Sequence, residues 1–235
     1  MKAEEDLERY LRPTPAIDSD NEEIRDFAED VTRGAKDEVE VAVRLFYAVR
    51  DGIWYDPYTP FHRLVDYKAS EVLKRKRAFC IPKAVLLCAL ARSMGIPSRL
   101  CFFDVRNHLA TKQLIEFLGT DVFVFHGVTE LFLKGKWVKA TPAFNKELCE
   151  LHKVPPVEFD GQKDAIFQAF NLEKRQFMEY LRFRGTYEDL PLQEIIEAFK
   201  VQYGNDRVQS WIDYFERTGK LSLRDFLKEE VWKGS

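Results

Sequence analysis

The sequence contains few cysteines and lacks the spaced motifs that mark metal and nucleotide sites. Its four cysteines include no Cys-x-x-Cys pair, and four are few for 235 residues, which argues against a structural zinc site and a disulfide scaffold. Gly-x-Gly-x-x-Gly, P-loop and His-Glu-x-x-His motifs are also absent. We therefore expect neither a cofactor nor a metal ion.

An excess of charge of one sign and a long apolar run are missing as well. The chain has 36 Lys and Arg against 39 Asp and Glu, a net charge of −3, so its composition gives no reason to expect a nucleic-acid groove or a membrane-surface patch. No stretch approaches the roughly 18 to 20 apolar residues of a membrane helix. The first residues, MKAEED, are acidic where a signal peptide is basic and then apolar. We expect a cytoplasmic protein that binds neither nucleic acid nor membranes.

Hydrophobic periodicity predicts helices in the first part of the chain. Apolar residues recur at helical spacing over about 24–31 and 39–52, and a short helix is expected over 69–76. The apolar residues of 81–94 are almost continuous, and Pro82 suits a first helical turn. The segment 81–94 is therefore predicted to be a buried central helix.

Strands are expected to follow that helix. Residues 99–103 form a predicted strand and 111–118 a short helix, while 121–133 and 137–141 flank Lys134-Gly135 as an antiparallel hairpin. The order of helix and then strands predicts an α+β fold in which the buried helix packs against an antiparallel sheet.

The remaining chain is predicted to be helical. A helix should open at Pro191, and another should begin after Gly204. Ser222 with Asp225 resembles a capping box. We expect residues 1–160 to form the core with its N-terminal helices, and 161–235 to form a helical C-terminal extension packed on that core.

Cys80 is the candidate nucleophile. It stands two residues before Pro82, at the start of the buried helix, where unpaired N–H groups and the helix dipole favour an anion. Such a position is expected to lower the pKa of a thiol and to let the Cys80 N–H serve an oxyanion. The alternative is a small buried apolar residue, as expected for Cys88 and Cys101 inside apolar runs.

His126 is the best-placed of the four histidines to act as the base for such a cysteine. It lies in the middle of the predicted strand, where a polar ring needs a partner to offset its burial. A satisfied structural histidine is the alternative.

Four segments in this order resemble the core of the transglutaminase-like superfamily. They are Arg77-Ala78-Phe79-Cys80, Met94-Gly95-Ile96-Pro97-Ser98-Arg99, His126-Gly127-Val128-Thr129-Glu130 and Gly135-Lys136-Trp137-Val138. The likeness covers about residues 39–145. The runs 104–109, 139–145 and 158–161 also resemble an uncharacterised bacterial subgroup of such proteins. It implies a papain-like core with a Cys-His-Asp arrangement, in which Cys80 is the nucleophile and His126 forms an ion pair with it and later protonates the leaving group.

The third catalytic position departs from the family pattern. The resemblance places Thr141 where the family has its Asp. A two-residue loop at 134–135 would set His126 opposite Ala143, with Thr141 and Asn145 flanking that position on one face. Asn145 is then a candidate to orient the imidazole, as the Asn does in Cys-His-Asn proteases, or a capping or turn residue.

More distant candidates for the same role are Asp104 and Asp160. Trp54 or Tyr55 is expected to line the acyl site and to supply a side-chain donor to the oxyanion, with core aromatics as the alternative.

The resulting functional prediction is thiol-dependent acyl chemistry on an amide or ester. The Cys-His pair fits a peptidase or amidase, and it also fits an amine acyltransferase. The expected substrate is a peptide, a protein or a small-molecule amide. The alternative is a catalytically weakened member of the family that acts as a binding module, because Thr141 replaces the Asp.

Overall fold

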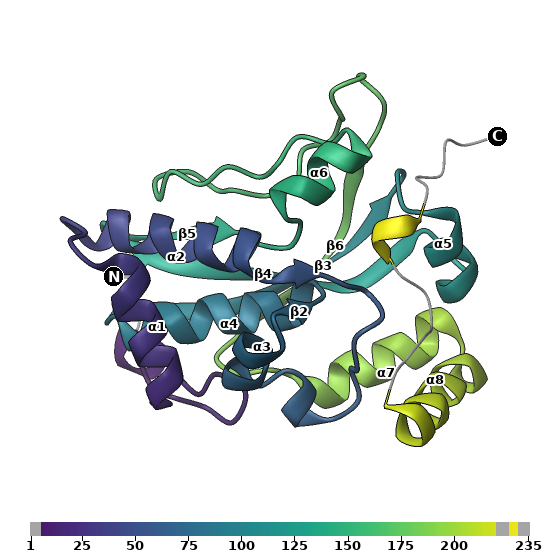
Figure 1. Ribbon diagram of the computed structural model, residues 1–235, viewed down its shortest axis with the longest axis horizontal. Helices are drawn as coiled ribbons and strands as arrows, with labels where there is room; N and C mark the ends of the chain where they lie inside the picture. Colours follow the sequence, from purple (N-terminus) through teal and green to yellow (C-terminus); the bar gives the residue numbers. More distant parts are fainter. Residues whose placement is uncertain (1–5, 220–225, 230–235) are drawn as a thin grey trace.

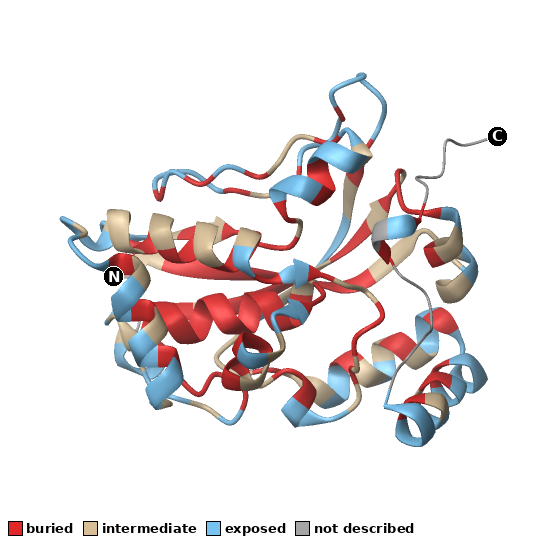
Figure 2. Cartoon of the chain, viewed as in Figure 1, coloured by how far each residue is buried: buried red, intermediate tan, exposed pale blue. Residues whose placement is uncertain are grey.

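Helix α4 (Cys80–Ser93) is the buried centre of the fold (Figure 1). The structure is a computed structural model that describes residues 6–219 and 226–229. Nearly all side chains of α4 are shielded from solvent (Figure 2), as expected for a helix that is apolar on every face. The helices packed against it are α1 (Glu22–Thr32), α2 (Glu38–Gly52) and α3 (Ala69–Arg75). The sequence predictions for these four helices are confirmed.

An antiparallel sheet of order β5-β4-β3-β6 packs against α4 through β3 and β4. Its strands are β3 (Ser98–Asn107), β4 (Val122–Leu133), β5 (Lys136–Ala140) and β6 (Met178–Tyr187). The β4–β5 hairpin turns at Lys134 and Gly135, both with positive φ, and pairs Leu133 with Lys136 as predicted. Two short parallel strands, β1 (Trp54–Tyr55) and β2 (Arg77–Ala78), pair beside the start of α4.

The prediction of a wholly helical segment after residue 161 is wrong at β6. This strand pairs with β3 and supplies an edge of the sheet. Two register shifts against β3 break the regular alternation of side chains, and exposed charged residues such as Arg182 are typical of an edge strand. Because of these register shifts and exposed charges, the sequence of β6 lacks the regular alternation of apolar and polar residues by which a strand is predicted.

The other described helices surround the sheet. The predicted helices are present as α5 (Lys112–Leu118), α7 (Leu192–Tyr203) and α8 (Asn205–Thr218), whereas α6 (Lys146–His152) was not predicted. Short 3₁₀ turns are η1 (Leu7–Tyr10), η2 (Leu64–Asp66) and η3 (Phe226–Lys228). The predicted capping box at Ser222 and Asp225 lies outside the described residues. The architecture is the predicted α+β fold, a central helix on an antiparallel sheet with helical segments at both ends.

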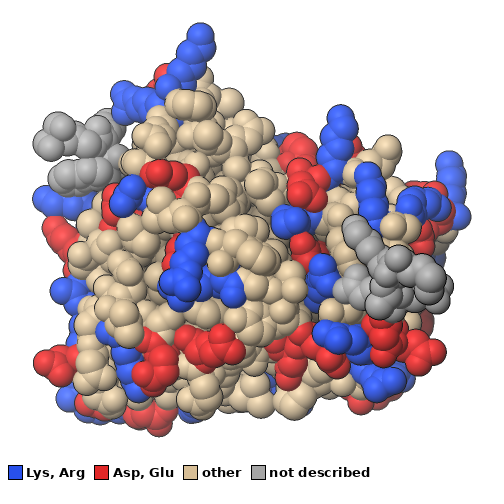
Figure 3. Space-filling model, turned by 180° about the vertical axis from the view of Figure 1, so that it is seen from behind, with Lys and Arg blue, Asp and Glu red and all other residues tan. Residues whose placement is uncertain are grey.

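On the face shown in Figure 3, positive and negative side chains are interspersed among uncharged ones. Within the described ranges, no helix combines the length and the apolar character that a membrane crossing requires.

Candidate active site

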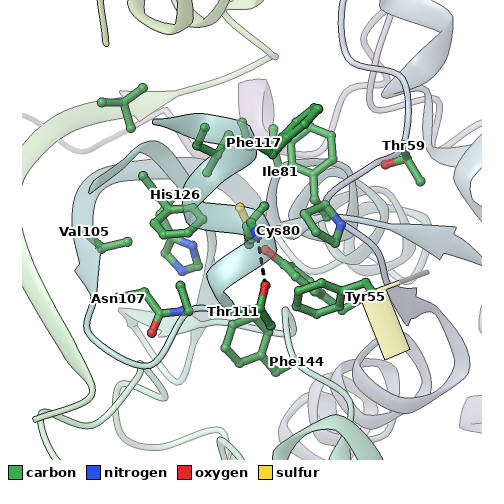
Figure 4. Close-up of a pocket in the computed structure, with 18 of the residues that line it drawn as sticks. Tyr55, Thr59, Cys80, Ile81, Val105, Asn107, Thr111, Phe117, His126 and Phe144 are labelled. Atoms are coloured by element: carbon green, nitrogen blue, oxygen red, sulfur yellow. Dashed lines mark hydrogen bonds between the residues drawn. The ribbon is translucent and has the colours of Figure 1, made fainter. Parts of the chain in front are cut away.

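A cavity of about 100 Å³ lies at the N-terminal end of α4. Cys80, the first residue of α4, and His126, from the middle of β4, both line it (Figure 4). The structure therefore brings together the two residues that the sequence singled out as nucleophile and base. Gly127, directly after His126, is where β4 meets the first turn of α4.

The Cys80 thiol has mixed surroundings. Burial raises the pKa of this thiol to about 11, while the N–H groups of Gly127, Ile81 and Cys80 itself act in the opposite direction. The expected lowering of the Cys80 pKa is therefore wrong for this structure. The helix N-terminus does offer its donors to sulfur, but the apolar setting penalises the thiolate more than those donors stabilise it.

His126 is a neutral imidazole at pH 7 in this environment. Its side chain is buried, and burial lowers the pKa of the ring to about 4. The rings of Phe167 and Tyr180 flank it, with centroids 5.3 and 6.5 Å away. Among the described residues, none offers a hydrogen bond to its buried Nε2 atom. Cys80 and His126 thus line one cavity as neutral groups, and the preformed ion pair that the resemblance implied is not present in this structure.

A β-bulge directly precedes His126. Phe125 has φ +56°, and its N–H donates to the Asp104 carboxylate at 3.2 Å. The bulge shifts the β3–β4 register, so that His126 pairs with Phe103. Arg184 fixes the same carboxylate with an Nε donor at 2.8 Å. Because bulges redirect the side chains that follow them, this cluster sets the direction of His126, and Asp104 acts on the strand rather than on the imidazole.

Thr141 is fully buried, and its hydroxyl has no hydrogen-bond partner in the described part of the chain. The hydroxyl of Tyr180 lies beside it. The hairpin ladder ends at Ala140, and the Thr141 N–H instead donates to the Ala165 carbonyl at 2.9 Å. The register expected from the hairpin therefore does not extend to His126, since the chain leaves β4 before reaching it.

The Asn145 side chain holds the segment that leads into β1. Its Oδ1 accepts from the Tyr55 N–H at 2.7 Å, and its Nδ2 donates to the carbonyls of Arg50 at 2.9 Å and Ile53 at 3.0 Å. These contacts occupy the amide in this structure and direct it to the backbone. Asn145 thereby fixes the position of Tyr55.

Lys83 supports the same segment and was not identified from the sequence. It is fully buried, and its Nζ donates to the Arg50 carbonyl at 2.9 Å. Burial lowers the pKa of Lys83 well below its ordinary value. The sequence did contain a signal for this role. Lys83 is the single charged residue inside the apolar run 81–91, and a charge buried in such a run needs a specific partner.

The two aromatic candidates, Tyr55 and Trp54, lie in different surroundings. Tyr55 is buried and lines the cavity, with its ring 4.7 Å from that of Phe144 and 5.6 Å from that of Phe226. Trp54 is 36% exposed and does not line the cavity. Successive side chains of a strand point to opposite faces, so only one of the pair turns inward.

The C-terminal helices contribute aromatic side chains that sequence reasoning had not assigned to the site. Phe199 and Tyr203 of α7 and Trp211 of α8 line the cavity. Trp211 stacks on Phe117 of α5 at 4.4 Å, and the Tyr203 hydroxyl accepts from the Val124 N–H at 3.2 Å. The amphipathic pattern of these helices was the sequence signal that their apolar faces pack against the rest of the protein.

Two solved structures resemble this fold at low sequence identity. One, from Cytophaga hutchinsonii and described as a "Putative Cysteine Protease", has 13% identity and a TM-score of 0.47, and the match covers 79% of this chain and 55% of that one. The other, from Parabacteroides distasonis and described as a "Putative Protease", has 18% identity and a TM-score of 0.38, with 57% and 25% covered. This chain thus spans about half and a quarter of their lengths.

Among proteins with curated descriptions, none has detectable sequence similarity to this chain. The family model of the transglutaminase-like superfamily matches residues 25–142, which are 118 of the 235 residues and include both Cys80 and His126. The chain belongs to the transglutaminase-like superfamily.

Proposed function

We propose that this protein is a thiol-dependent enzyme that forms an acyl-enzyme on Cys80 from an amide or ester substrate. The observation that carries the proposal is that Cys80, at the start of a buried helix, and His126, on the neighbouring strand, line one cavity. Membership of the superfamily supports thiol-dependent chemistry in the broad sense. The substrate is a peptide, a protein or a small molecule with an amide or ester carbonyl.

The pKa directions favour general-base catalysis over a resting ion pair. With the pKa of Cys80 raised to about 11 and that of His126 lowered to about 4, both groups are neutral at pH 7. As Sγ bonds to the carbonyl carbon, the thiol proton passes to the imidazole, which then donates it to the leaving group as the bond to that group breaks. Water or an amine resolves the acyl-enzyme by the same proton route.

Backbone donors support both the sulfur and the developing oxyanion. The N–H groups of Gly127, Ile81 and Cys80 lie close enough to the sulfur to affect its pKa. Fixed N–H groups in a dry site stabilise developing negative charge more than they do in water. The Cys80 N–H is the one we assign to the oxyanion.

A binding module without catalysis is the second candidate. It is favoured by Thr141, which brings no charge to the position where the family has an Asp, and by the raised pKa of Cys80. A module of this kind would keep the cavity and lose the reaction.

Trapping of the acyl-enzyme separates the two candidates. The protein is incubated with an activated ester, and the acylated cysteine is located by intact-mass and peptide mass spectrometry. We expect label on Cys80, none in Cys80→Ala, and a rate at least ten-fold lower in His126→Ala. Cys88, Cys101 and Cys149 are buried and serve as internal controls. Label that is absent from Cys80, or indifferent to His126, would favour the binding module.

A further inference from the structure

We propose that the cavity beside Cys80 holds a short, uncharged aliphatic acyl group, with about four carbons beyond the reacting carbonyl. This inference rests on the proposed function and names its substrate class. It derives from the charge, the walls and the size of the cavity.

The cavity wall carries no formal charge at neutral pH. None of the described residues that line it is Asp, Glu, Lys or Arg. Its two histidines, His126 and His152, have pKa values lowered to about 4 by burial and are neutral as well. A charged group entering this space would lose its hydration without gaining an ion pair, so the wall selects against carboxylate and ammonium substituents.

Most of the wall is aromatic or aliphatic, and it comes from segments far apart in the chain. Phe199 and Trp211 from the C-terminal helices meet Leu114 and Phe117 of α5 and Phe123 of β4. Phe61 bridges this group, with its ring 5.7 Å from Phe199 and 6.2 Å from Trp211. Such a wall recognises its ligand through buried apolar area.

The volume sets how many carbons of the group the cavity can enclose. An apolar cavity of about 150 Å³ holds benzene, which has six carbons. By proportion, a cavity of about 100 Å³ accommodates about four carbons. A pentanoyl or 3-methylbutanoyl group satisfies this limit, whereas an octanoyl group exceeds it.

The position of Cys80 assigns the cavity to the acyl side of the substrate. The acyl group stays bonded to Sγ after the leaving group departs, so the space that Cys80 borders must hold it through the second half of the reaction. With a thioester, the thiol of Cys80 and R–CO–S–R′ give Cys80–S–CO–R and R′–SH. One S–C bond forms, one breaks, and the proton moves to the departing sulfur through His126.

The test measures acylation of Cys80 by S-ethyl thioesters of two, four, five, six and eight carbons, and by the thioester of glutarate, which is pentanoyl with a terminal carboxylate. We expect the rate to rise by up to about four-fold per added CH₂, to peak at five carbons and to fall at eight. The glutaryl thioester should react at least ten-fold more slowly than pentanoyl.

A matched pair of thioesters tests which side of the substrate carbonyl the cavity holds. S-ethyl pentanethioate and S-pentyl ethanethioate have the same atoms and differ only in which side carries the chain. We expect the first to acylate Cys80 at least ten-fold faster. Faster reaction of the second would overturn the acyl assignment.

Variants of the wall should move the optimum. Trp211→Ala enlarges the cavity and should shift the preference towards octanoyl, while Ala110→Leu fills it and should shift the preference towards acetyl. Val201→Ala is the matched control, because Val201 lies on α7 but is 86% exposed. The chain-length preference is a ratio within one variant, so a partial loss of folded protein does not imitate the shift.

The outcomes for the cavity and for the reaction are distinguishable. Equal rates at all chain lengths, or a glutaryl rate equal to the pentanoyl rate, would overturn the acyl-group proposal and leave the thiol chemistry standing. No acylation of Cys80 by any thioester would overturn the proposed function and the acyl assignment together. Binding of pentanamide, acetamide and glutaramate to Cys80→Ala, measured by calorimetry, then tells whether the cavity still selects an uncharged chain.

Discussion

Gly127 lies so close to Ile81 that any side chain would collide with the backbone of α4. A Cβ at Gly127 would be 2.8 Å from the Ile81 Cα and 3.2 Å from the Cys80 carbonyl oxygen. Backbone atoms in the first turn of a buried helix cannot move aside cheaply, so this contact fixes the spacing between the strand that carries His126 and the helix that carries Cys80.

Gly127→Ala should therefore separate the two elements. We expect a loss of about 1–3 kcal/mol in the free energy of unfolding and a fall of more than ten-fold in the rate of Cys80 acylation. Urea denaturation and acyl-enzyme trapping measure the two effects. Gly52→Ala is the control, because a Cβ there meets nothing within 4 Å. An unchanged acylation rate in Gly127→Ala would show that this contact does not set the catalytic geometry.

The Asp104 carboxylate should control the direction of His126 through the bulge at Phe125. Asp104→Ala removes the acceptor of the Phe125 N–H and leaves Arg184 without its partner, so we expect a loss of about 3 kcal/mol and slower acylation. Asp104→Asn keeps an oxygen for the Phe125 N–H and should retain most of the rate. Equal rates for the Ala variant and the native protein would contradict a positioning role.

The buried imidazole should make the fold acid-sensitive. The pKa of His126 is about 4 in the folded protein against 6.5 unfolded, so its neutral form stabilises the fold fully above pH 6.5, and this contribution is lost as the pH falls towards 4. Between pH 7 and pH 5 the expected loss is about 2 kcal/mol.

Urea denaturation at both pH values measures this loss. His126→Phe should reduce the loss, and His152→Phe should act in the same direction, because the pKa of His152 is also lowered to about 4. A pH dependence that neither substitution changes would mean that other groups cause it.

The pH profile of acylation should report a neutral pair. If His126 acts as a base with a pKa of about 4, the rate should hold from pH 8 to about pH 5 and fall only near pH 4. Alkylation of Cys80 by iodoacetamide should be slow at pH 7 and should rise towards its pKa of about 11. Rapid alkylation of Cys80 at pH 5 that depends on His126 would instead indicate a resting ion pair.

Thr141→Asp should restore a carboxylate at the position where the family has one. Thr141 and the Nε2 of His126 are both buried without hydrogen-bond partners in the described structure. A negative charge near the ring favours the imidazolium, so the pKa of His126 should rise from about 4 by at least one unit. The imidazole resonances in an NMR titration give this value. Thr141→Asn is the uncharged control, and an unchanged pKa in Thr141→Asp would place Thr141 outside the site.

The elements that carry the chemistry follow from local patterns in the amino-acid sequence. The apolar run 81–94 indicated a buried helix that begins at Cys80, because a helix without a polar face has nowhere to lie except the core. The turn at Lys134 and Gly135 determined the β4–β5 hairpin, since both residues adopt the positive φ that such a turn requires. These are local properties, set within a few residues of each other.

The pKa values and the walls of the site arise instead from packing between distant segments. The helix start predicted a lowered pKa for Cys80, but burial by distant segments raises it to about 11. Asn145 was a candidate partner of the imidazole, and its contacts are to the chain near Tyr55. Desolvation and long-range packing depend on segments more than a hundred residues apart, such as Trp211 beside Phe61. Periodicity, which reports only on neighbours in the chain, contains no information about them.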